Sequence, residues 1–139
     1  MSSHLETDER FPSGRWTGFF TDKRLPGKQD MELMLEFELG RMTGTGRDRV
    51  GTFTINGTYQ VTDGLCEFLK QYPGSHAVNY HGFNEGKGIW GKWELRQSTC
   101  TGGFHIWPDG MADPSQPVME EEADIPHEIE SEKLEPVGV

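Results

Sequence analysis

The sequence predicts an all-β protein, a small antiparallel meander β-barrel of about eight strands. The first observation behind this is a short unit that recurs along the chain: a large apolar residue, any residue, glycine, any residue and an aromatic residue. The unit is found at Trp16-Gly18-Phe20, Ile55-Gly57-Tyr59 and Ile89-Gly91-Trp93. Alternate residues of a strand share a face, so each unit places its three residues on one side of a strand. Glycine on such a face is typical of places where a sheet bends into a barrel.

The second observation is the alternation in residues 31–39. Every odd position is apolar, and three of the four even positions are glutamate. A helix would spread these glutamates over its apolar stripe, whereas a strand separates the two classes onto opposite faces. The segment is therefore predicted to be a strand with one face in water.

Turn residues divide the rest of the chain into short strands. We expect strands at residues 15–21, 31–39, 41–46, 51–61, 65–72, 75–83, 89–95 and 103–107. Two of these have alternatives: Asn56-Gly57 could form a hairpin turn, and residues 65–72 also have helical spacing. Eight short strands with short connections favour a closed barrel, with an open sandwich as the competing architecture.

Composition divides the chain into three parts. Residues 1–13 are expected to be a flexible leader, residues 14–108 the barrel, and residues 109–139 an acidic disordered tail. The tail holds ten acidic residues and one basic residue, so it carries about −9 of the net charge of −10. The barrel is nearly neutral, which argues against a nucleic-acid or anionic-membrane partner.

Targeting signals are not evident in the sequence. No apolar run approaches the roughly 18 residues that span a bilayer, and the polar N-terminus does not resemble a secretory signal. We therefore expect a cytoplasmic protein in which Cys66 and Cys100 stay reduced.

The opening Gly14-Arg15-Trp16 resembles the Gly-x-Trp that begins the first strand of calycins, the lipocalin, fatty-acid-binding and streptavidin-like barrels. Residues 89–95, with Trp93, also resemble the late tryptophan-bearing strand of the streptavidin-like branch. The resemblance implies a barrel with one open mouth, in a superfamily that mostly binds small apolar or amphipathic ligands. It assigns no ligand-contacting residue to this chain.

Motifs of catalysis and metal binding are absent from the sequence. The chain has no Gly-x-Ser-x-Gly, no phosphate loop, no Cys-x-x-Cys and no His-Glu-x-x-His. A metal site built on His81 and His105 would need a third ligand, so surface histidines are the simpler interpretation. We expect no catalytic residue, no metal and no cofactor.

Two groups of residues are candidates for function. Tyr59, His76 and Tyr80 are polar groups predicted to point inward between Trp16 and Trp93, a composition suited to a small-ligand pocket. The alternative is that aromatic side chains fill the barrel and leave no cavity.

The second group lies on the outer face. Trp90 and Trp107 fall outward on adjacent strands together with His105, and two exposed tryptophans on one face are typical of an interface. A register error of one residue would reverse this assignment.

Three functions follow from these groups. The first is a non-catalytic interaction module that self-associates or docks a protein through the Trp90/Trp107 face. The second is a carrier of a small apolar or amphipathic ligand in the barrel mouth. The third is a barrel enzyme with His76 as general base and a tyrosine as acid.

Overall fold

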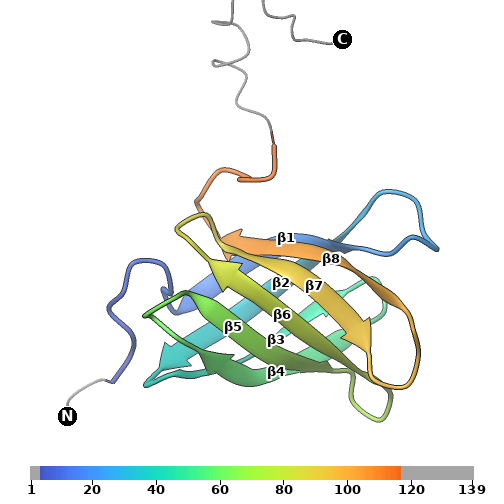
Figure 1. Ribbon diagram of the computed structural model, residues 1–139, viewed down its shortest axis with the longest axis horizontal. Helices are drawn as coiled ribbons and strands as arrows, with labels where there is room; N and C mark the ends of the chain where they lie inside the picture. Colours follow the sequence, from blue (N-terminus) through green and yellow to red (C-terminus); the bar gives the residue numbers. More distant parts are fainter. Residues whose placement is uncertain (1–3, 117–139) are drawn as a thin grey trace, which may run out of the picture.

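The computed structural model describes residues 4–116, and within them the chain forms a closed eight-stranded barrel (Figure 1). The strands are β1 (Gly14–Thr21), β2 (Lys28–Glu38), β3 (Arg41–Asp48), β4 (Thr52–Tyr59), β5 (Leu65–Gln71), β6 (Ala77–Asn84), β7 (Ile89–Leu95) and β8 (Thr101–Pro108). Each strand pairs antiparallel with the next, and β8 closes the barrel by pairing with β1. The predicted meander barrel is confirmed, and the open sandwich is excluded.

Several strand boundaries differ from those expected. β4 runs without a break through Asn56 and Gly57, so these residues form no hairpin turn. The strand ends at Tyr59 and not at residue 61 as expected, and Val61 is 41% exposed in the following turn. β6 begins at Ala77, which leaves His76 in the preceding loop. Residues 65–71 form a strand and not a helix.

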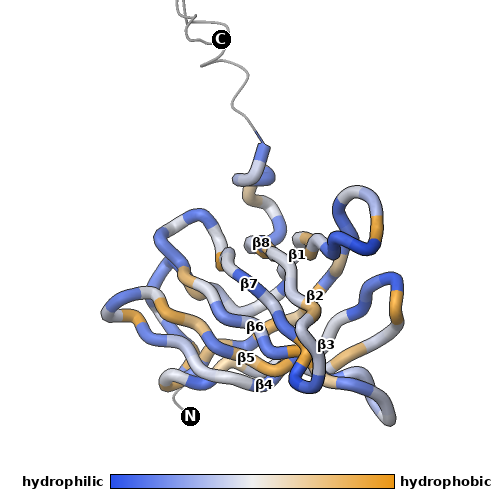
Figure 2. The backbone as a smooth tube through the Cα atoms, turned by 45° about the vertical axis from the view of Figure 1, so that its right-hand side comes forward, coloured by the Kyte–Doolittle hydropathy of each residue, from blue (hydrophilic) through white to orange (hydrophobic). Residues whose placement is uncertain are grey.

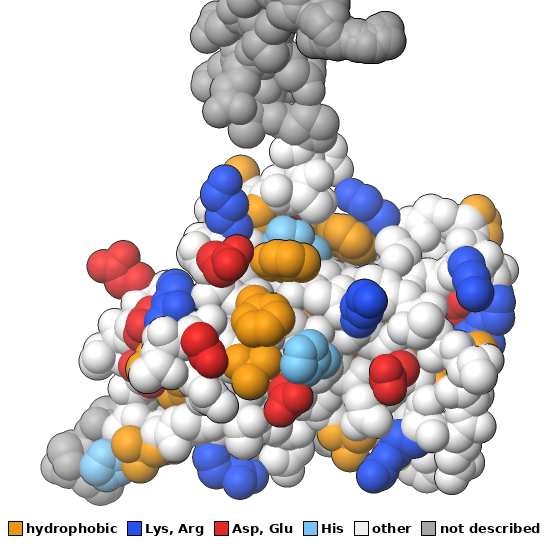
Figure 3. Space-filling view, viewed as in Figure 1, with side chains coloured by type: hydrophobic (Ala, Val, Ile, Leu, Met, Phe, Trp, Pro, Cys, Tyr) orange, Lys and Arg blue, Asp and Glu red, His pale blue; other side chains and the backbone are white. Residues whose placement is uncertain are grey.

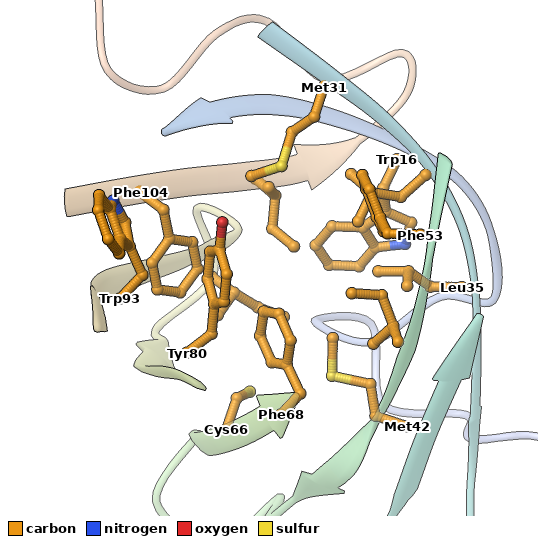
Figure 4. Close-up of a cluster of buried hydrophobic side chains, with 14 of the residues drawn as sticks. Trp16, Met31, Leu35, Met42, Phe53, Cys66, Phe68, Tyr80, Trp93 and Phe104 are labelled. Atoms are coloured by element: carbon orange, nitrogen blue, oxygen red, sulfur yellow. The ribbon is translucent and has the colours of Figure 1, made fainter. Parts of the chain in front are cut away.

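Hydrophobic and hydrophilic residues alternate along the strands (Figure 2). The inward residues of all eight strands fill the barrel interior with large side chains. In Figure 4 the labelled core residues converge from several strands, and the ring of Tyr80 lies beside Phe68 and Phe104. The glycines of the recurring unit are required by close strand approach. A Cβ on Gly18 would lie 2.2 Å from the carbonyl oxygen of His105, and one on Gly91 would lie 2.1 Å from that of His81.

One end of the barrel is covered by residues 5–13, at the left in Figure 1. Phe11 is fully buried and packs against Phe37 and Tyr59, with ring centroids 5.4 and 4.8 Å away. The indole of Trp16 donates to the carbonyl of Pro12, and the Tyr59 hydroxyl donates to Glu6 Oε1 over 2.6 Å. This part of the predicted flexible leader is therefore held against the barrel. We call this the closed end.

The opposite end, at the right in Figure 1, is formed by four loops at residues 22–27, 49–51, 72–76 and 96–100. No other segment of residues 4–116 covers it, and we call it the open end. Beyond β8, residues 109–116 of the predicted tail are described, and residues 117–139 lie outside the described part of the chain. Cys66 and Cys100 are both free.

Across residues 4–116 we find no helix with the length and apolar character that crossing a membrane requires.

Candidate ligand site at the open end of the barrel

The five ligand-binding residues predicted from the sequence do not form one site. Trp16 and Tyr59 lie at the closed end, in contact with residues 5–13. Tyr80 and Trp93 lie in the interior nearer the open end, and both are at most 4% exposed. His76 is exposed on the rim, where its ring lies 4.9 Å from that of Tyr72 and its Nδ1 lies 3.1 Å from Ser75 Oγ.

A buried lysine that sequence reasoning missed lies below this rim. Cys66, Phe68 and Lys70 alternate inward along β5, which carries the Lys70 side chain into the barrel, where it is 1% exposed. Its Nζ lies 2.5 Å from Oδ2 of Asp48, the last residue of β3. The same ammonium donates to the Tyr80 hydroxyl over 3.2 Å and to the sulfur of Met31 over 3.6 Å.

Aromatic rings surround the Lys70 ammonium. Its Nζ lies 4.5 Å from the ring centroid of Phe53, 4.7 Å from Phe20, 5.3 Å from Tyr72 and 5.4 Å from Tyr80. The negative faces of such rings attract a cation and partly replace its lost hydration. Removing a charge from water costs several kcal/mol, and only close pairing with further hydrogen bonds offsets that cost.

Both carboxylate oxygens of Asp48 accept further hydrogen bonds. The Tyr72 hydroxyl donates to its Oδ2 over 2.6 Å, and the backbone N–H of Val50 donates to its Oδ1 over 2.8 Å. Lys70 and Asp48 together carry no net charge, so the cluster is a neutral layer across the barrel in which both the Lys70 ammonium and the Tyr72 hydroxyl contact the Asp48 carboxylate. We refer to Asp48, Lys70, Tyr72 and Tyr80 as the floor cluster.

Burial determines the acid–base behaviour of the floor cluster. It lowers the pKa of Lys70, while the hydrogen bond and charge of Asp48 act in the opposite direction. It also raises the pKa values of Tyr72 and Tyr80, and Asp48 raises them further. Both phenols therefore stay protonated at neutral pH; the Tyr72 hydroxyl donates to Asp48, and the Tyr80 hydroxyl accepts from Lys70.

A depression of about 780 Å³ lies above the floor cluster, between the loops of the open end. Its walls combine apolar groups, such as Phe20, Val50 and Leu95, with the charged groups of the rim. Beneath it a small inner cavity of about 80 Å³ is lined by Lys70, Tyr72, Tyr80 and Trp93, among others. Apart from this space, aromatic side chains occupy the core together with aliphatic ones, close to the filled-barrel alternative.

The rim of the depression is basic, although the protein as a whole is acidic. The four loops of the open end contain Lys23, Arg24, Arg49 and Arg96 against the single acid Asp22. Arg24 pairs with Asp22, and Arg49 donates to Gln29 Oε1 over 3.1 Å. Arg96, which lines the depression, makes no ion pair or side-chain hydrogen bond within residues 4–116.

The three predicted interface residues all point outward, because Trp90 pairs with His105 in the β7–β8 register and Trp107 follows two residues later. Trp90 is 47% exposed, whereas Trp107 is only 6% exposed. The Trp107 ring packs edge-on against those of Phe19 and His105, with centroids 6.1 and 5.5 Å away. The interface assignment itself stays a prediction.

His81 and His105, the two outward histidines, each contact a different partner. His81 Nδ1 lies 2.9 Å from Glu67 Oε2, and His105 Nε2 lies 2.7 Å from the carbonyl oxygen of Lys87. Within residues 4–116, no three His, Cys, Asp or Glu side chains are grouped so as to hold a metal ion.

A signal for the floor cluster was present in the sequence. Extending the inward parity of Cys66 and Phe68 by two residues predicts an inward Lys70. No sequence pattern, however, shows that Asp48 lies beside it, because β3 and β5 are separated by β4 and meet only across the barrel interior.

No known protein guides the assignment of this site: no family model, curated protein or solved structure matches the chain.

Proposed function

We propose that this protein is a small-ligand-binding module whose site is the depression at the open end. The observation that carries the proposal is the combination of the depression with the floor cluster beneath it. Ligand sites in proteins are typically concave, about 300–1,000 Å³ in volume, mostly apolar and furnished with a few fixed polar groups. The depression of about 780 Å³ fits this description.

The floor cluster supports the proposal through its rigidity. A buried ion pair contributes little net stability compared with apolar residues of similar volume. Beneath an open mouth, however, its Lys70, Tyr72 and Tyr80 line the small inner cavity and fix polar groups and aromatic rings below the depression. Preorganised polar groups bind without a reorganisation cost, which favours affinity.

The residues that line the depression favour a ligand that has both a negative charge and an apolar part. Arg49 and Arg96 line the depression beside Phe20, Val50 and Leu95. The calycin-type fold named by the sequence resemblance is compatible with such a carrier, since the closed meander barrel is its coarse architecture. A cytoplasmic location remains part of the same proposal.

A fluorescent probe tests this proposal directly. Anilinonaphthalene sulfonate is aromatic and anionic, and its emission rises on transfer to an apolar site. Titrated with the full chain, it is expected to bind, and R49A/R96A is expected to weaken binding by about three- to tenfold, since each exposed charge pair contributes about 0–1 kcal/mol. R41A removes the same kind of charge from a strand that begins at the closed end and is expected to change nothing.

A second comparison separates the mouth from the outer surface. W90A removes the most exposed tryptophan and is expected to leave probe binding intact. Binding that is lost in W90A and retained in R49A/R96A would overturn the proposal and place the probe on the barrel wall.

A further inference from the structure

A row of four apolar side chains and one histidine crosses the outside of the barrel at right angles to its strands. Strand register places Leu65 opposite Phe83, Phe83 opposite Trp90, Trp90 opposite His105, and His105 opposite Phe19. Five neighbouring strands, β5, β6, β7, β8 and β1, each contribute one residue. We call these five residues the outer aromatic row. The central part of this surface is visible in Figure 3, where apolar side chains and two histidines gather over β6, β7 and β8.

The row is only partly covered by the described chain. At its centre, Phe83 is 38% exposed and Trp90 is 47% exposed. At its β1 end, Phe19 is half-buried, with the Lys28 ammonium 4.4 Å from its ring centroid. Contiguous exposed apolar surface of this kind is typical of a contact site.

The chain beyond β8 returns to this row. The Lys28 ammonium that lies over Phe19 also donates to Ser115 Oγ over 3.2 Å, which brings residue 115 to the β1 end of the row. Pro114 and Ser115 line a groove of about 610 Å³ together with Phe19, Trp90 and His105, among others. The segment that follows β8 thus lines this groove as far as Ser115, one residue before the described part of the chain ends at Gln116.

We propose that residues 117–119 of the same chain dock in this groove and cover Trp90. These residues are Pro117, Val118 and Met119, the first apolar group after Gln116, and the acidic run that begins at Glu120 follows at once. Three extended residues span about 10 Å, so they reach across a groove in which Ser115 already lies. Val118 and Met119 supply apolar side chains to an apolar wall, and proline limits the conformational freedom lost on docking.

This assignment differs from an interface with a second copy or another protein, because the occupant is tethered beside its site. A tethered segment has an effective concentration of about millimolar, so weak apolar contacts suffice for it to compete with a free partner. The outer aromatic row is then an intramolecular docking surface, independent of the ligand site at the open end.

Acrylamide quenching of tryptophan fluorescence tests the proposal. Trp16, Trp93 and Trp107 are 1%, 4% and 6% exposed, so quenching by this neutral agent reports mainly on Trp90. In the full chain the quenching constant is expected to rise at least twofold in V118D/M119D. V137D introduces the same type of charge far along the tail and is expected to leave quenching at the wild-type value. W90F is expected to abolish the difference, which would identify Trp90 as the reporter.

Two outcomes would overturn the proposal. Equal quenching in the wild-type chain and in V118D/M119D would show that these residues do not cover Trp90. Quenching that falls as protein concentration rises, together with a dimer mass, would assign the row to a second copy. Binding of the sulfonate probe is expected to be the same in V118D/M119D and wild type, so failure here leaves the open-end site unaffected.

Discussion

The two ends of the barrel bury polar groups in different ways. At the closed end, buried polar side chains are satisfied largely by the backbone of an added segment: Asn84 Nδ2 donates to the carbonyl of Arg10, and Trp16 donates to that of Pro12. At the open end, Lys70 and Asp48 satisfy each other, helped by Tyr72. Hydrogen bonds to the backbone of residues 5–13 require that this segment cover the closed end. The ion pair of Lys70 and Asp48 requires no covering segment at the open end.

This difference explains why, within residues 4–116, the open end keeps a depression and the closed end is filled. Residues 5–13 fill the closed end with Phe11, and Trp16 and Tyr59 are buried core residues in contact with this segment. The floor cluster leaves a depression above it, with basic groups on the rim. The Lys70–Asp48 ion pair therefore leaves the open end accessible, whereas the Phe11 side chain fills the closed end.

Breaking the ion pair at the open end is expected to have the largest effect. K70M leaves the buried Asp48 carboxylate without its cation and is expected to lower the free energy of unfolding by about 3–5 kcal/mol. The double variant D48N/K70M removes both charges and is expected to recover most of that loss, because burying a neutral pair costs far less. Urea denaturation of the three proteins measures both differences.

K92M serves as the control for this comparison, since Lys92 is exposed on β7 and is expected to cost less than about 0.5 kcal/mol. A double variant as unstable as K70M would contradict the view that uncompensated charge is the cause.

Truncating the buried Phe11 side chain at the closed end is expected to have the next largest effect on the free energy of unfolding. Phe11 is fully buried against Phe37 and Tyr59, and F11A is expected to cost about 3 kcal/mol through lost burial and the cavity left behind. F83A truncates a phenylalanine that is 38% exposed and is expected to cost much less. Amide hydrogen exchange is expected to accelerate first in residues 5–13, and equal protection of these residues in F11A and wild type would mean that Phe11 does not hold the segment.

Alkaline titration compares both ends through the three tyrosines of the chain. Burial, followed by the hydrogen bond to Glu6, raises the pKa of Tyr59 to about 12, and burial raises those of Tyr72 and Tyr80 further. A raised native pKa means that the folded protein holds more protons than the unfolded chain above pH 10. Stability is therefore complete below about pH 10 and falls as pH rises through the native values, by up to about 1.4 kcal/mol per tyrosine for each pH unit.

Phenolate absorbance checks this expectation. No tyrosine is expected to ionise near pH 10 while the barrel is folded, and all three are expected to ionise together with unfolding. Y59F should reduce the pH dependence of stability by about a third, because it removes one of the three groups. A phenol that titrates near pH 10 in the folded protein would show that its end of the barrel admits water.

The sequence by itself determined the barrel. The recurring glycine unit placed Trp16, Ile89 and Trp93 inward, and alternation in residues 31–39 fixed the two faces of β2, because side-chain direction in a strand depends only on parity. Parity also placed Trp90 outward, and it would have placed Lys70 inward if the pattern of β5 had been extended.

Only the tertiary structure decided which end of the barrel each inward residue occupies. Alternation along a strand shows that a residue points inward, but not whether it lies at the end that residues 5–13 cover. Trp16 and Tyr59 were therefore grouped with Tyr80 and Trp93. Alternation also cannot predict that Trp107 is covered by Phe19 and His105, or that Asp48 meets Lys70 across the interior. The contact of Phe19 with Trp107 joins the first strand to the last, and that of Asp48 with Lys70 joins strands that are not neighbours, so both follow from closure of the sheet and not from any local pattern.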